Sequence, residues 1–206
     1  MTRIELFDEI INNPWKLTNE LLRLLILPLS VFYSLLTISK YDFTWKLYGL
    51  PIFQINKKSR VLLGKRMELR SSAYSNPLTP YNKVTLSTRS KNSLLTIGDD
   101  FAMTGGSVIC ATTITIGNRV KVGANVVIMD TDFHPIRFQD RKANINNGKT
   151  APIIIEDDVF IGTGTIILKG TTLGKGSVIG AASVVTKDVE PNSIYAGNPA
   201  RKITKI

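Results

Sequence analysis

The chain holds little cysteine and little histidine, with one residue of each kind in 206, Cys110 and His134. A lone cysteine excludes a disulfide framework within the chain and is typical of proteins kept in a reducing cytoplasm. A lone histidine argues against a zinc centre built from three different histidines, so we expect no bound metal. Any step that needs an imidazole has to use His134.

The chain also lacks an apolar stretch long enough to span a membrane. Residues 24–39 are sixteen residues without a charge, but Arg23 and Lys40 close the stretch and Pro28 interrupts it. A spanning helix needs about 20 apolar residues. Two interpretations remain open: a helical hairpin that packs on the same chain or on a neighbouring subunit, and a segment that lies in a membrane interface.

Acidic residues are scarce in the first half of the chain. Residues 1–96 contain 14 Lys and Arg against 6 Asp and Glu, which is +8 of the total net charge of +10. This half should prefer an anionic neighbour, such as acidic lipid, a phosphorylated carrier or an acidic polysaccharide. No base-reading motif accompanies the charge, so we expect no nucleic-acid partner.

What the sequence does contain is a six-residue period. Aliphatic residues recur at every sixth position from 155 to 185, and a small or β-branched residue follows each of them four positions later. The aliphatic positions are Ile155, Ile161, Ile167, Leu173, Ile179 and Val185. Such a short period predicts a parallel β-helix, in which each hexad forms one short strand and one corner. An earlier run is predicted at Ile97, Met103, Ile109, Ile116, Val122 and Ile128, with one residue inserted at a corner before Ile116.

The period is interrupted once, over residues 133–152, which are polar and basic. A β-helix needs no excursion of about 20 residues for its own closure, so we interpret this segment as a functional loop. We expect two parts: a helical arm and connector over residues 1–60, and the β-helix over residues 61–206. Within the arm, the sequence predicts an amphipathic helix over residues 1–12 and a second helix capped by Thr18.

His134 lies where the repeat passes into the loop, which makes it the candidate general base. Asp130 and Asp132 precede it at alternate positions, and a nearby carboxylate would hold one ring nitrogen and raise the basicity of the other. The alternative is a surface histidine with no chemical role. Cys110 follows a predicted interior position, so we interpret it as structural and expect no covalent acyl-enzyme.

Several motifs together resemble the hexapeptide-repeat acyltransferases, most closely the maltose and galactoside acetyltransferases and their polysaccharide O-acetyltransferase relatives. They are the Ile-Gly hexads, Thr131-Asp132-Phe133-His134-Pro135, Ile161-Gly162-Thr163-Gly164 and the tail Tyr195-Ala196-Gly197-Asn198-Pro199-Ala200-Arg201. The resemblance implies an all-β fold, a left-handed parallel β-helix with an N-terminal helical arm and one extruded loop. It also implies acetyl-CoA as the donor and a homotrimer with active sites between subunits.

The resemblance further implies residue roles. His134 matches the family's base, and the positions that match the family's CoA site are Phe160, Thr163, Ala181, Thr186, Lys187 and Arg201. In the galactoside enzymes an asparagine assists at the acceptor, but the matching stretch here is residues 102–106. Thr104 takes that place, or Asn125 does, or neither does; Arg137 in the loop is a further predicted acceptor contact.

The expected function is therefore acetyl transfer from acetyl-CoA to a saccharide hydroxyl. Two alternatives stay open: N-acetylation of an amino sugar, and a non-catalytic β-helix scaffold. The expected partners are two further copies of the chain, a saccharide, and a membrane or lipid-linked sugar contacted through residues 17–70. The expected location is the cytoplasm, including the inner face of the membrane.

Overall fold

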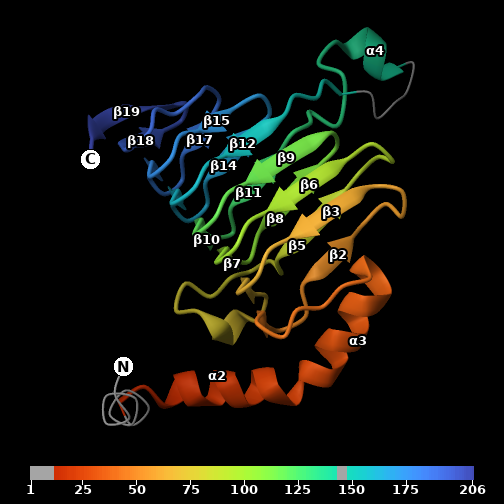
Figure 1. Ribbon diagram of the computed structural model, residues 1–206. Coiled ribbons are helices and arrows are strands. Elements are labelled where there is room, and N and C mark those ends of the chain that lie inside the picture. Colours follow the sequence, from red (N-terminus) through yellow and green to blue (C-terminus); the bar gives the residue numbers. More distant parts are fainter. Residues whose placement is uncertain (1–11, 143–147) are drawn as a thin grey trace.

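Three parallel sheets make up most of the protein (Figure 1). The computed structural model describes residues 12–142 and 148–206. Sheet A contains β1 (Lys46–Tyr48), β4 (Glu68–Arg70), β7 (Ala102–Thr104), β10 (Lys121–Ala124), β13 (Phe160–Ile161), β16 (Val178–Ile179), β18 (Ser193–Gly197) and β19 (Ala200–Lys205). Sheet B contains β2 (Ile52–Gln54), β5 (Thr85–Thr88), β8 (Ser107–Cys110), β11 (Val127–Met129), β14 (Ile166–Leu168) and β17 (Val184–Val185). Sheet C contains β3 (Arg60–Leu63), β6 (Leu94–Ile97), β9 (Thr113–Ile116), β12 (Ile153–Ile155) and β15 (Thr172–Leu173).

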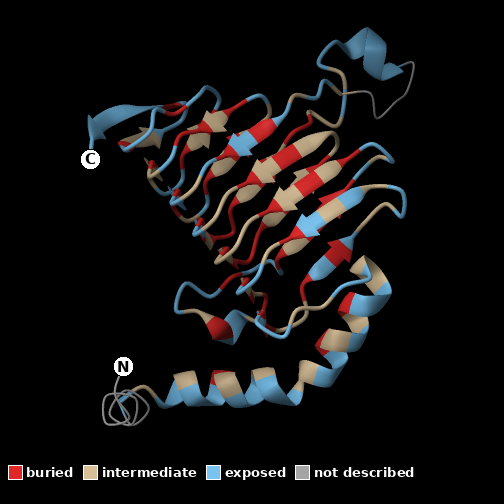
Figure 2. Ribbon diagram, in the orientation of Figure 1, coloured by how far each residue is buried: buried red, intermediate tan, exposed pale blue. Residues whose placement is uncertain are grey.

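Successive strands move from one sheet to the next, and every third strand returns to the same sheet until the antiparallel β18–β19 pair ends the stack. The hexads predicted this parallel β-helix, and the family resemblance implied its left-handed form. The six aliphatic residues from Ile155 to Val185 are at most 1 % exposed, and the small residues four positions later are at most 3 % exposed. Stacking is close at the corners, since a Cβ on Gly162 would lie 2.6 Å from the backbone nitrogen of Ala181. In Figure 2 buried residues (red) recur along the strands of the β-helix.

One predicted interior residue is wrong. Val108 is fully buried and pairs with Ile128, whereas Ile109 points outward. The step from Met103 to Val108 is one residue shorter than a hexad, and the step from Val108 to Ile116 is two residues longer. The net insertion predicted for this coil is therefore present, but a shortened β7–β8 corner precedes it.

The predicted boundary between the two parts is also wrong. β1 pairs with β4 and β2 pairs with β5, so the first coil of the β-helix begins at Lys46 and not after residue 60. Its interior is filled by Trp45, Leu47 and Phe53. Leu47 and Phe53 are six residues apart, but the next buried residue, Leu63, follows Phe53 only after ten positions. The period is therefore broken within the first coil, which is why the sequence pattern missed it.

Two helices precede the β-helix: α2 (Pro14–Leu25) and α3 (Leu27–Ile38). The N-cap of α2 is Asn13, so the predicted cap at Thr18 is wrong; the Thr18 hydroxyl instead donates to the carbonyl of Pro14, 3.2 Å away. The helix predicted over residues 1–12 falls almost wholly on residues outside the described part. No single described helix is long and apolar enough to cross a membrane, although α2 and α3 pass that test as a pair bent by 54°.

Two irregular segments extend from the β-helix. Residues 71–82 contain a 3-10 turn, η1 (Ala73–Ser75). The interruption after β11 carries the short helix α4 (Phe138–Lys142), which stands away from the sheets (Figure 1). The predicted extruded loop is thus present, at the corner between sheets B and C.

Candidate active site

The loop after β11 leaves and rejoins the β-helix through two antiparallel arms. Thr131 bridges Thr150, the backbone nitrogen of Asp132 donates to the carbonyl of Lys149 at 3.0 Å, and that of Gly148 donates to the carbonyl of Phe133 at 3.3 Å. The arms touch so closely that a Cβ on Gly148 would lie 2.7 Å from the backbone nitrogen of His134. The backbone of His134 is therefore held in a fixed place at the loop base.

The His134 side chain is exposed to solvent at this base. Its backbone nitrogen donates to the carbonyl of Asp132 at 2.6 Å, so the two residues form a tight turn. Oδ1 of Asp132 accepts from Nζ of Lys169 at 2.6 Å, and both side chains are about three-quarters buried, with 24 % and 26 % of their areas exposed. Oδ2 of Asp132 is buried without a hydrogen-bond partner among the described residues. An acceptor oxygen is thus available two residues from the imidazole.

Asp130 has a different role from the predicted one. It is fully buried, and its carboxylate accepts four hydrogen bonds from the corner after β8. The donors are the backbone nitrogens of Ala111, Thr112 and Thr113 and the hydroxyl of Thr112, at 2.6–3.0 Å. Because both oxygens are occupied by this corner, the prediction that Asp130 orients His134 is wrong.

Cys110 lies in the same corner and is fully buried. Burial, with the nearby charge of Asp130, raises the pKa of the thiol to about 12. A thiol in that state does not form the thiolate that nucleophilic catalysis requires. The structural interpretation of Cys110 is confirmed.

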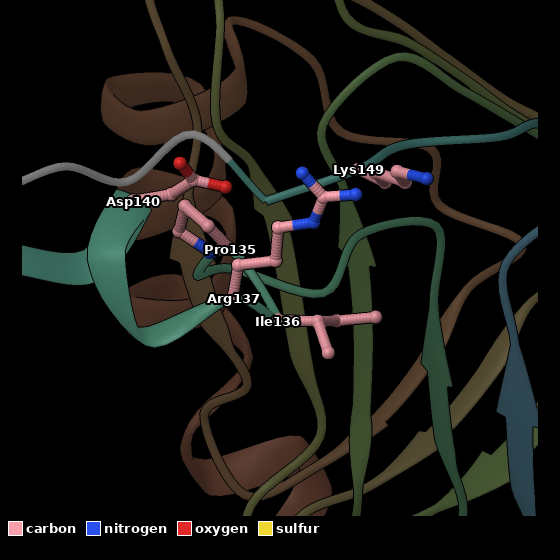
Figure 3. A pocket seen from close by; sticks show the side chains of 5 residues that line it. All are labelled: Pro135, Ile136, Arg137, Asp140 and Lys149. Atoms are coloured by element: carbon pink, nitrogen blue, oxygen red, sulfur yellow. The ribbon is translucent and has the colours of Figure 1, made fainter.

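A cavity of 510 Å³ opens in the loop (Figure 3). Pro135, Ile136, Arg137, Asp140 and Lys149 line it. Two cations and one carboxylate give it a positive balance, and the nitrogens of Arg137 reach across the opening towards Lys149 in Figure 3. Such a cavity is suited to polar and anionic groups.

The predicted CoA positions fall into two groups. Lys187 and Arg201 line one cavity of 350 Å³ at the C-terminal end of the β-helix, where Lys202 pairs with Glu190. Thr186 precedes Lys187 in the same corner and is exposed.

The second group lies at the corner between sheets A and B. Thr163 and Ala181 stack there in successive coils, with the backbone nitrogen of Ala182 donating to the carbonyl of Thr163 at 2.8 Å. Phe160 on β13 is 49 % exposed.

Asn125 and Thr104 occupy that second corner one and two coils earlier, respectively, but each is only 8 % exposed. Segment 76–82 covers them: Nδ2 of Asn76 donates to the Thr104 hydroxyl at 3.4 Å, and the backbone nitrogen of Asn82 donates to Oδ1 of Asn125 at 3.3 Å. Both side chains thus hold segment 76–82 against the β-helix. Of the alternatives for the acceptor contact, this geometry favours neither residue.

The candidate groups therefore lie on two different corners of one chain. His134 is at the corner between sheets B and C, and Thr163 is at the corner between sheets A and B, with the width of sheet B between them. The outer face of sheet B carries partly exposed apolar side chains, namely Ile109, Val127, Met129, Ile166, Leu168 and Val184. A site that used both corners would need two chains. Among the described residues there is no group of His, Cys, Asp and Glu that would hold a metal ion.

Three residues of this arrangement were not found from the sequence: Lys169, Lys149 and Gly148. Lys169 interrupts a hydrophobic hexad with a charge, and that was the available signal. The other two sit in the aperiodic loop, where spacing does not indicate which arm meets which.

Known proteins carry the same repeat. The family described as "Hexapeptide repeat of succinyl-transferase" matches residues 95–129 and 152–187, the segments on either side of the loop. Over these two segments the chain is similar to the hexapeptide-repeat acyltransferases.

The hexapeptide-repeat chain is 41 % identical over 117 residues to the galactoside O-acetyltransferase of Escherichia coli K12, covering 56 % of this chain and 50 % of that one. It is 47 % identical over 92 residues to the polysialic acid O-acetyltransferase of Escherichia coli O1:K1, covering 45 % and 29 %. The chain spans about half the length of the first curated relatives it matches.

Among solved structures, the maltose O-acetyltransferase from Clostridium difficile 630 aligns with a TM-score of 0.48 at 27 % identity, covering 79 % of this chain and 70 % of that one.

Proposed function

We propose that this hexapeptide-repeat protein is an acetyl-CoA-dependent O-acetyltransferase that acts on a saccharide hydroxyl, with His134 as the general base. The observation that carries the proposal is the exposed imidazole of His134 at the base of a long loop. Two antiparallel arms hold the backbone of this residue in place, and the next residue, Pro135, lines the cationic cavity. Relatives named as sugar O-acetyltransferases are 41 % and 47 % identical to parts of this chain and support the same reaction class.

In this mechanism the acceptor hydroxyl lies against an unprotonated ring nitrogen of His134. The imidazole takes the hydroxyl proton while the oxygen attacks the thioester carbonyl carbon, the C–S bond breaks, and the sulfur leaves as the thiol of CoA after accepting that proton. Oδ2 of Asp132 is buried without a hydrogen-bond partner among the described residues. In the proposed mechanism the imidazole turns so that this oxygen accepts a hydrogen bond from the other ring nitrogen and stabilises the imidazolium as it forms. Lys169 fixes the carboxylate by holding Oδ1.

Acetyl-CoA carries phosphates, and Lys187 and Arg201 together would hold its anionic end in the C-terminal cavity. The double replacement Lys187→Gln with Arg201→Gln should weaken CoA binding by at least about tenfold, since two charge-assisted contacts are lost. Isothermal titration with CoA measures the change. Lys205→Gln, an exposed cation on β19 outside that cavity, is the matched control and should bind as wild type. Unchanged affinity in the double variant would place the phosphates elsewhere.

The Gly148→Ala variant tests the loop base. The added Cβ forces the arm that carries His134 to shift, and a displacement of about 1 Å at a catalytic group can cost about 100-fold in rate. We expect a loss of about 10- to 100-fold in kcat/KM for acetyl transfer with little change in the thermal unfolding midpoint. Full activity in a normally folded variant would show that the close contact between the two arms does not position His134.

The proposal includes a homotrimer, because the groups at the two corners of sheet B come together only when chains pack side by side, and the apolar outer face of that sheet supports such packing. It also includes a cytoplasmic location, where acetyl-CoA is supplied. Analytical ultracentrifugation measures the oligomeric state.

The acceptor class is tested by offering saccharides with free hydroxyls and matched amino sugars, and by following release of the CoA thiol. Ester formation supports O-acetylation, whereas amide formation alone would select the N-acetyltransferase alternative. A chain that binds no CoA in calorimetry would be the non-catalytic scaffold.

A further inference from the structure

Helices α2 and α3 carry their large apolar side chains on the side that faces away from the β-helix. Leu25 at the bend is 76 % exposed, and Phe32 and Leu36 on α3 are 62 % and 68 % exposed. The same outward stripe, which we call the outer stripe, also includes Leu17, Leu21, Leu24, Leu29 and Leu35, each between 42 % and 53 % exposed. Figure 2 shows both helices with long exposed surfaces beneath the sheets.

The residues of the two helices that are buried against the β-helix are polar instead, while Tyr33 and Ile38 pack there partly buried. Asn19, Ser30 and Ser34 are the buried residues of the two helices, at 7 %, 1 % and 0 % exposed. Nδ2 of Asn19 donates to the carbonyl of Tyr74 at 3.0 Å. A surface helix of a water-soluble protein normally buries its apolar face and exposes its polar face. The inverted pattern indicates that the outer stripe meets an environment other than water.

The helices cannot roll to hide this stripe, because contacts on the inner side fix them. The hydroxyl of Tyr48 on β1 donates to Glu20 on α2, and Nδ2 of Asn19 on the same helix donates to the carbonyl of Tyr74. On α3, the ring of Tyr33 stacks on Phe53 with centroids 5.7 Å apart, and its hydroxyl accepts from the backbone nitrogen of Phe53. Turning either helix would break these contacts.

Charge distinguishes a lipid surface from a second copy of the chain as the cover. Residues 1–96 carry a net charge of +8, so packing this face on its own copy brings like charges together. Lys16 lies over the ring of Trp15 at the start of α2, and Lys57 lines a groove of 640 Å³ with Leu36 at the end of α3. Cations and a tryptophan beside an apolar stripe are typical of helices that lie in the interface of an anionic membrane.

We propose that the outer stripe of α2 and α3 docks the protein on an anionic lipid surface, with the bend at Leu25 inserted deepest. The helices lie in the interface and do not cross it, since the pair is bent by 54° and tied to the β-helix along its length. This inference concerns a different surface from the acetyl-transfer site and stands or falls separately from it.

The test is co-sedimentation of the full chain with vesicles of phosphatidylcholine, with and without phosphatidylglycerol. Wild type should bind the vesicles that contain phosphatidylglycerol and dissociate as salt is raised. The triple variant Leu25→Gln, Phe32→Gln and Leu36→Gln should lose at least about tenfold in apparent affinity, because three side chains no longer enter the apolar layer. The matched control Leu78→Gln with Ile203→Gln replaces side chains that are 57 % and 65 % exposed elsewhere and should bind as wild type.

Thermal unfolding and size-exclusion chromatography accompany each variant, so that a misfolded sample is recognised. Wild type that stays in solution with every vesicle overturns the proposal, as does a triple variant that binds like wild type. Loss of self-association in the triple variant, together with no vesicle binding by wild type, would mean that a second copy covers the stripe, which also overturns it.

Discussion

Replacing His134 by alanine is expected to lower acetyl transfer by at least about 100-fold, the usual contribution of a positioned general base. The chain has no second histidine, so no other imidazole of the same chain can take over the proton transfer. The residue is exposed at the loop base, so its replacement should leave the thermal unfolding midpoint and the affinity for CoA unchanged. Initial rates of thiol release from acetyl-CoA, measured at saturating acceptor, give the result.

Arg89→Gln is a suitable comparison for that experiment. The guanidinium of Arg89 lies 5.5 Å from the ring centre of Phe133, next to His134 in the chain, but is not needed in the proposed proton transfer. We expect a much smaller loss in this variant than in His134→Ala. Near-wild-type transfer in His134→Ala would rule out the imidazole as the base, whatever the comparison gave.

Replacing Asp130 by alanine is expected to lower the free energy of unfolding by about 3–5 kcal/mol, the range found when one partner of a buried charged network is removed. The carboxylate is fully buried, and its four hydrogen bonds satisfy the three successive backbone nitrogens of the corner after β8. Without it, those nitrogens would be left unpaired in the interior, which is itself costly. Urea unfolding followed by circular dichroism measures the change.

The matched control is Asp132→Asn, which removes the other aspartate near His134. Asparagine keeps the shape of Asp132 and an acceptor oxygen for Lys169, so this change should cost less stability than Asp130→Ala but should lower the rate of acetyl transfer. We thus expect the Asp130 variant to lose mainly stability and the Asp132 variant to lose mainly turnover. An Asp130→Ala protein as stable as wild type would contradict the structural role assigned here.

The sequence was sufficient to predict the β-helix because each hexad places one aliphatic residue inside and the next coil repeats it. The same logic failed in the first coil, where the step from Phe53 to the next buried residue, Leu63, is ten residues. It also failed at Ile109, where a short corner moves the interior position to Val108. The six-residue spacing of aliphatic residues does not by itself show at which corner the chain is one residue shorter or longer.

The site was harder to predict because its partners are far apart in the chain. His134 and its loop were visible in the sequence as an interruption of the repeat. The spacing made Asp130 and Asp132 equally good candidates for the carboxylate that orients His134, and only their hydrogen bonds distinguish them. Lys169 lies near Asp132 because successive coils stack, and Gly148 lies near His134 because the two arms of the loop run side by side. Neither contact is visible as a pattern in the local sequence. The inverted polarity of α2 and α3 likewise required knowing which side faces the sheets.

The central claim is tested most directly by incubating the full chain with acetyl-CoA and a panel of neutral and acidic saccharides, then measuring thiol release and the mass of the products. The account predicts thiol release that depends on a hydroxyl acceptor, with a product heavier by one acetyl group and an ester that mild base removes. CoA binding without acetyl transfer to any saccharide, or modification of amino groups alone, would contradict it.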